Sequence, residues 1–138
     1  MKNWFDIQRA YPFFWMWLNA WLKSKGADTV QVLNEGASSE ICKVRFASYK
    51  DRELSDEMVD EMLDEAGIRV CIDFDAEDTV PAWRYVIFKN NGITALWNQT
   101  YDSNYIFKDR KSAQRTGFLF AIKEHDESLK KQNAVEQY

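Results

Sequence analysis

The hydrophobic pattern of residues 41–74 changes its period twice, and this change most constrains the fold. Residues 41–48 alternate, with Cys42, Val44 and Phe46 on one side and charged side chains on the other, as in a half-buried strand. Residues 58–66 repeat their apolar side chains at helical spacing, and residues 68–74 alternate again. A strand, a helix and a second strand in immediate succession predict an α+β fold.

The other elements are predicted from similar signals. They are helices at 12–26 and 109–131 and strands at 29–33, 83–89, 93–98 and 105–107. Pro12 suits the first turn of its helix. Asn91-Gly92 is a strong signal for a two-residue turn and predicts a hairpin in which Val86 opposes Trp97. Residues 132–138 are polar and are expected to form a frayed tail.

The length of 138 residues fits one domain, which we expect to span residues 1–138. The expected architecture is an antiparallel sheet of four to six strands packed against about three helices, in the order α-β-β-α-β-β-β-β-α. A core of this size needs no disulfide or metal ion for stability.

The charge of the chain is unevenly distributed. Its formal net charge of −4 argues against general nucleic-acid binding, which favours a basic surface. Carboxylates on the helix at 55–67 form two rows at i, i+4 spacing, and no basic residue interrupts them: Asp56, Glu57, Asp60, Glu61, Asp64 and Glu65. Such like-charge pairs oppose helix formation by about 0.2–0.5 kcal/mol each. The stripe is either a solvated face or a docking face for a basic protein partner.

The helix at 12–26 is apolar on nearly every side and carries Trp15, Trp17 and Trp21. Core packing is the first explanation. A surface for self-association or for a partner is the second, since Trp and Tyr favour interfaces. Insertion into a membrane surface is the third, although the segment lacks the basic polar face of such helices. The run from Tyr11 to Leu22 is shorter than the roughly 20 residues that span a bilayer.

No arrangement of residues predicts a catalytic, cofactor or metal site. Asp73, Asp75 and Asp78 resemble a cation-binding loop, but the loop lacks the glycine and the bidentate glutamate of the calcium template, and a solvated loop is the preferred interpretation. His125 lies late in a helix, where exposure is expected. Cys42 and Cys71 are expected to be reduced, buried thiols. With no secretion signal visible, the expected location is cytoplasmic.

Residues 83–88 (Trp-Arg-Tyr-Val-Ile-Phe), residues 105–118 and residues 17–26 resemble in rhythm small phage or prophage proteins of gut bacteria. Those proteins often combine a leading helix with a late hairpin followed by a helix. The resemblance implies a compact α+β fold, and it implies no catalytic residues.

The leading hypothesis is a non-enzymatic binding or regulatory protein that docks a basic protein partner through the acidic helix face, with self-association through the Trp-rich helix as a second interaction. No cofactor, nucleic-acid or membrane partner is expected. The alternative is a small carboxylate- or metal-dependent hydrolase or nucleotide-handling enzyme that uses Asp73, Asp75 and Asp78.

Overall fold

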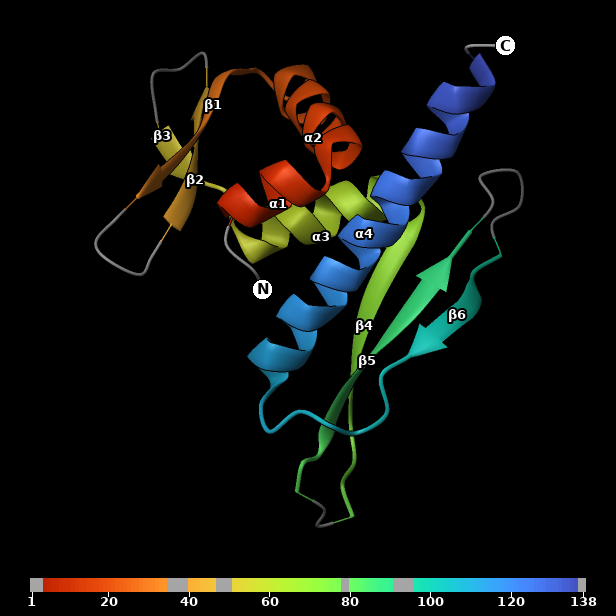
Figure 1. The fold of residues 1–138 in the computed structure, drawn as a ribbon. Coiled ribbons are helices and arrows are strands. Elements are labelled where there is room, and N and C mark those ends of the chain that lie inside the picture. Colours follow the sequence, from red (N-terminus) through yellow and green to blue (C-terminus); the bar gives the residue numbers. More distant parts are fainter. Residues whose placement is uncertain (1–3, 35–39, 47–50, 78–79, 91–95, 137–138) are drawn as a thin grey trace. The chain divides into compact units, whose positions relative to one another are not determined.

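The computed structural model describes residues 4–34, 40–46, 51–77, 80–90 and 96–136. The chain forms two compact units: unit 1 holds residues 56–121, and unit 2 holds residues 2–55 together with residues 122–138. Each unit combines helices with one antiparallel three-stranded sheet (Figure 1). The predicted α+β class is therefore confirmed. The one-domain organisation over residues 1–138 stays a prediction.

Unit 1 contains α3 (Asp56–Glu65), β4 (Ile68–Phe74), β5 (Trp83–Lys89), β6 (Asn98–Asp102) and the first part of α4 (Arg110–Glu136). The strand order is β4-β5-β6, so β5 is central. The helix α4 packs closely on one face of this sheet at Gly117, where a β-carbon would lie 2.6 Å from Val70 Cγ1 and 3.0 Å from Tyr85 Cβ. Phe120 continues this contact and stacks on Tyr101, with ring centroids 4.2 Å apart.

Unit 2 contains α1 (Trp4–Ala10), α2 (Pro12–Ser24), β1 (Ala27–Asn34), β2 (Glu40–Phe46), β3 (Asp51–Glu53) and the later part of α4. Its strands are ordered β1-β2-β3. Its buried side chains include Ile7, Phe14, Leu18, Leu22, Cys42 and Val44. Cys42 and Val44 of β2 are thus buried as the alternating pattern predicted, whereas Phe46, predicted on the same side, is half-buried.

The helix α2 begins at Pro12, as predicted, and a further helix, α1, precedes it. No side chain of Tyr11 caps α2. Instead, Asp126 of α4, which is buried, accepts a hydrogen bond at Oδ1 from the Phe14 N–H over 2.9 Å. This bond satisfies one of the free N–H groups of the first helical turn, the role that a local cap usually takes.

The structure corrects several details of the predicted elements. The described strands form two sheets of three rather than one sheet. The predicted turn at Asn91-Gly92 lies outside the described residues, but Val86 pairs with Asp102 rather than with Trp97. Residues 105–107 contribute one bridge, between Phe107 and Trp83, instead of a strand. The helix α4 continues to Glu136, beyond the predicted end at residue 131.

Candidate functional site

The acidic face of α3 is the first candidate. Val59, Met62 and Leu63 are buried, so the helical period turns the carboxylates away from the core. Gly67, with φ of +82°, follows the helix, in the left-handed conformation that commonly ends helices. The predicted spacing of buried and charged side chains on this helix is therefore confirmed.

Arginines neutralise both ends of the acidic face. Asp56 Oδ2 lies 3.7 Å from Arg115 Nε, and Asp64 Oδ1 lies 2.6 Å from Arg69 Nε. The Arg69 guanidinium also lies over the ring of Trp97, 4.3 Å from its centroid. These contacts reduce the repulsion between carboxylates that the sequence predicts at the two ends of the helix.

The middle of the same face stays open. Glu57, Asp60 and Glu61 are exposed, and within the described part of the chain neither glutamate forms an ion pair. Partial desolvation and the neighbouring Asp64 charge raise the pKa of Asp60, while Arg69 lowers it. The exposed carboxylates of Glu57, Asp60 and Glu61 therefore concentrate negative charge at the centre of the helix.

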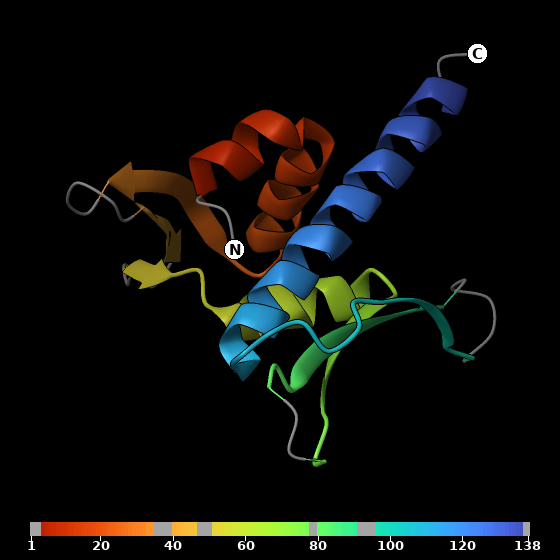
Figure 2. The ribbon, with the colours of Figure 1, turned by 60° about the horizontal axis from the view of Figure 1, so that its bottom comes forward.

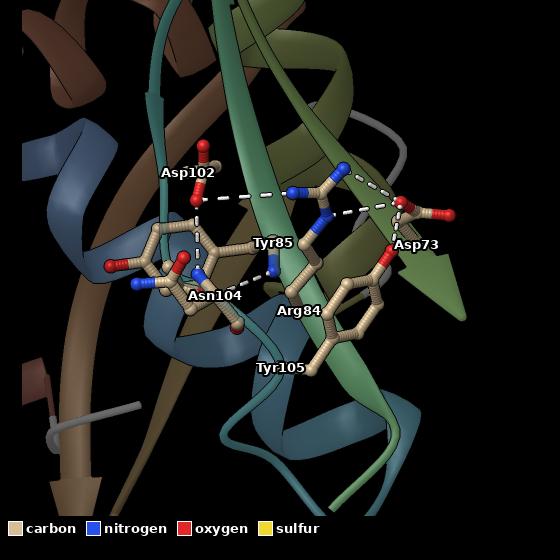
Figure 3. A network of polar contacts seen from close by, with 7 residues as sticks. Asp73, Arg84, Tyr85, Asp102, Asn104 and Tyr105 are labelled. Atoms are coloured by element: carbon tan, nitrogen blue, oxygen red, sulfur yellow. Dashed lines mark hydrogen bonds and ion pairs between the residues drawn. The ribbon is translucent and has the colours of Figure 1, made fainter. Parts of the chain in front are cut away.

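A second polar cluster joins β4, β5 and the segment after β6 (Figure 3). Asp73 Oδ2 accepts hydrogen bonds from Arg84 Nε over 3.0 Å and from the Tyr105 hydroxyl over 2.7 Å, and it lies 2.9 Å from Arg84 Nη2. The Arg84 guanidinium also lies 4.8 Å from the Tyr105 ring centroid. The Tyr105 and Arg84 hydrogen bonds hold the pKa of Asp73 below its ordinary value.

The same network continues into the turn after β6. Asp102 Oδ1 accepts the N–H of Asn104 over 3.1 Å and lies 3.9 Å from Arg84 Nη1. Ser103 Oγ accepts the N–H of Tyr85 over 3.0 Å. Asn104 adopts a φ of 60°, a conformation that Asn tolerates better than most residues. The cluster therefore fixes an irregular turn against the sheet.

The predicted cation loop is not brought together as a ligand set. Asp73 is engaged by Arg84 and Tyr105, and Asp75 Oδ1 accepts the backbone N–H of Glu77 over 2.9 Å. Asp78 lies outside the described residues. Among those described, no group of three or more His, Cys, Asp and Glu side chains is placed to hold a metal ion.

The tryptophans of α2 are half-buried in unit 2. Trp15 lies against Trp4, with centroids 6.4 Å apart, and the rings of Trp17 and His125 form a T-shaped pair with centroids 4.5 Å apart. Lys25 Nζ lies 5.4 Å from the Trp21 ring. His125 is therefore packed against an aromatic ring, and the expectation that it is exposed is wrong because α4 turns it toward α2 within this unit.

The two cysteines differ in environment. Both are free thiols; Cys42 is buried and Cys71 is exposed. Burial raises the pKa of the Cys42 thiol to about 12. The prediction of a buried thiol is wrong for Cys71, because it alternates with Val70 and Ile72 and shares the outward face of β4 with Arg69 and Asp73.

Comparison of the chain with protein-family models, with curated proteins and with solved structures gave no match. Within the parts of the chain that are described, no helix has both the length and the apolar character needed to cross a membrane.

Trp97, Tyr105 and Arg115 were not predicted as site residues. Only their partners in space give them a role, and no local sequence pattern signals those partners.

Proposed function

We propose that this protein is a non-enzymatic binding or regulatory protein that docks a basic protein partner through the acidic face of α3. The observation that carries the proposal is the exposure of Glu57, Asp60 and Glu61 on a helix whose opposite face is buried. The proposal includes a cytoplasmic location and no nucleic-acid partner. An inhibitor, an immunity-type protein or an accessory factor would fit this description.

The arrangement of charges supports this function in a specific way. Arg69 and Arg115 pair with the carboxylates at the helix ends. The buried Val59, Met62 and Leu63 hold the helix in position, so its central carboxylates face solvent. A fixed acidic patch attracts a basic partner over a distance of about one Debye length, which is roughly 8–10 Å at moderate salt. Such attraction raises the rate of encounter and favours one orientation.

The enzyme alternative has weaker geometric support. Asp73 is its first candidate carboxylate, and its Oδ2 accepts hydrogen bonds from Arg84 and Tyr105. These contacts lower the pKa of Asp73, whereas a general acid needs a raised pKa. We therefore assign Asp73 to the scaffold of unit 1 in this proposal.

Affinity capture from source-cell lysate tests the proposal. The variant Glu57→Gln/Asp60→Asn/Glu61→Gln removes the central charges without changing side-chain size and leaves both arginine contacts intact. The control Asp28→Asn/Glu127→Gln removes two exposed negative charges from unit 2. A basic partner captured by the wild type and the control, and lost by the neutralised variant, is the expected result. Equal capture by all three proteins would contradict the proposal.

A further inference from the structure

The strand β4 lies at one edge of the sheet in unit 1, since the strand order is β4-β5-β6. No other described strand pairs with its outer side (Figure 2). An edge strand presents unpaired N–H and C=O groups to any chain that can match them, and proteins usually protect such edges with charged side chains, lysine above all, with proline, or with very short strands. The seven residues of β4 contain neither lysine nor proline, and their two charged side chains, Arg69 and Asp73, carry opposite charges that a second copy can match.

The backbone groups that face the outer edge follow from the hydrogen bonds to β5. The Asn90 N–H bonds to the Gly67 carbonyl over 3.0 Å, and the Asp75 N–H bonds to the Ala82 carbonyl over 2.8 Å. Bonded and non-bonded pairs alternate along antiparallel strands, so the odd-numbered residues of β4 bond to β5. The backbone N–H and C=O groups that point to the outer edge of the sheet, away from β5, are therefore those of Ile68, Val70, Ile72 and Phe74.

We propose that two copies of this protein pair through these outward groups, with the β4 strands antiparallel and Cys71 at the two-fold axis. In this register Val70 faces Ile72 of the second copy, and Ile68 faces Phe74. The edge N–H and C=O groups of each strand then lie opposite the edge C=O and N–H groups of the other strand. A two-fold axis requires such self-complementarity, because both copies present the same surface.

The side chains of β4 are also self-complementary. Arg69 faces Asp73 of the second copy in this register, so each strand supplies one cation and one anion. Their side chains are 51% and 45% exposed. Existing contacts use Nε of Arg69 and Oδ2 of Asp73, so a pair between Arg69 Nη and Asp73 Oδ1 leaves those contacts in place. The second copy also covers part of Phe74, which is 52% exposed.

The position of Cys71 provides a direct probe of the register. Its own backbone bonds to β5, so Cys71 and its copy form a non-bonded pair across the new interface, with a Cα separation of about 4.5 Å. This separation lies within the range of roughly 4.4–6.8 Å that a disulfide accepts. An added oxidant that takes two electrons and two protons from the two thiols can therefore join the chains.

Sedimentation of the full chain over a concentration series, in reducing buffer, tests the pairing. The wild type and Cys71→Ser are expected to dimerise. Cys71→Lys places two like charges directly opposite each other and should weaken the dimer by about tenfold or more. Gln99→Lys, at an exposed position of the opposite edge strand β6, is the matched control and should dimerise like the wild type. A monomeric wild type, or an equal dissociation constant for Cys71→Lys, would overturn the proposal.

Mild oxidation with copper phenanthroline and air then tests the register. At concentrations where sedimentation shows the wild type to be dimeric, a disulfide between the two Cys71 side chains is expected. The variant Cys71→Ser/Gln99→Cys, which carries its thiol on the opposite edge strand, should cross-link far more slowly. Equal rates would show that the disulfide forms by random collision and would contradict the register. This inference does not depend on the acidic face of α3, so the pairing and the proposed function fail or succeed separately.

Discussion

Several side chains of this protein make contacts with residues that are distant in the sequence, and these contacts determine their structural roles. Asp126 lies far from α2 in the sequence and yet bonds to the N–H of Phe14. Asp73 binds Arg84 across one strand pair and Tyr105 beyond β6. Cys42 and Cys71 both lie in strands but have opposite exposure.

The two cysteines should differ in reactivity. At low protein concentration, a maleimide reagent is expected to label the native chain once, at Cys71, because Cys42 is buried and its thiol pKa is raised to about 12. Partial desolvation also raises the Cys71 pKa, so labelling should speed up as the pH rises. Mass spectrometry of the intact and digested protein counts and locates the label. Labelling of Cys42 in the folded protein would contradict this account.

Replacing the buried carboxylate of Asp126 should destabilise unit 2. Asp126→Ala leaves the Phe14 N–H without its acceptor and should cost about 1–2 kcal/mol of unfolding free energy. Asp126→Asn keeps an acceptor oxygen and should cost less. Denaturant unfolding, with Glu127→Ala as an exposed control on the same helix, gives the comparison. An equal effect of Asp126→Ala and Glu127→Ala would show that the bond contributes nothing.

The contacts of Asp73 should make part of the stability depend on pH. Its pKa in the folded protein lies below the ordinary value of 3.8, so the folded state favours the ionised form. The stabilisation should be complete above pH 3.8 and should be lost as the pH falls through the lowered pKa. The measurement is the unfolding free energy of the wild type minus that of Asp73→Asn across acidic pH. A difference that does not shrink with acidification would contradict this assignment.

At the scale of the element, the packing of α4 on its sheet depends on a glycine. Gly117→Ala would usually favour a helix by about 0.5–1 kcal/mol. Here the added β-carbon would lie 2.6 Å from Val70 Cγ1, and overpacking of this kind costs about 1–3 kcal/mol. We therefore expect Gly117→Ala to lower the melting temperature, whereas Ser128→Ala, at an exposed position of α4, should leave it almost unchanged. A more stable Gly117→Ala protein would show that the contact relaxes without cost.

The elements whose own residues show a clear alternating or helical hydrophobic pattern were predicted well. The strands β4 and β5 have the predicted bounds, 68–74 and 83–89, because their alternation and flanking turn residues are local signals. The strand β6 (Asn98–Asp102) lies later in the chain than the predicted strand at 93–98, and its Tyr101 stacks on Phe120 of α4. Local turn chemistry could not predict that contact, and it also gave no sign of Trp97 over Arg69 or of the Arg115–Asp56 ion pair.

At the scale of the whole molecule, the acidic residues are concentrated in one part of the chain. Residues 51–78 hold twelve of the 22 Asp and Glu residues and only two Arg. In the structure, this concentration includes an exposed helix face whose ends are held by arginines. The proposed function and the proposed self-association use different elements of unit 1, α3 for the first and the edge of β4 for the second.

The most direct test of the proposed function is the rate of association between the purified protein and the captured basic partner, measured at increasing ionic strength. An acidic docking face predicts that the wild-type rate falls as salt is added. It also predicts that Glu57→Gln/Asp60→Asn/Glu61→Gln binds about tenfold more slowly at low salt, with the two rates converging at high salt. A wild-type rate that does not change with salt and equals that of the variant would show that α3 is only a solvated surface.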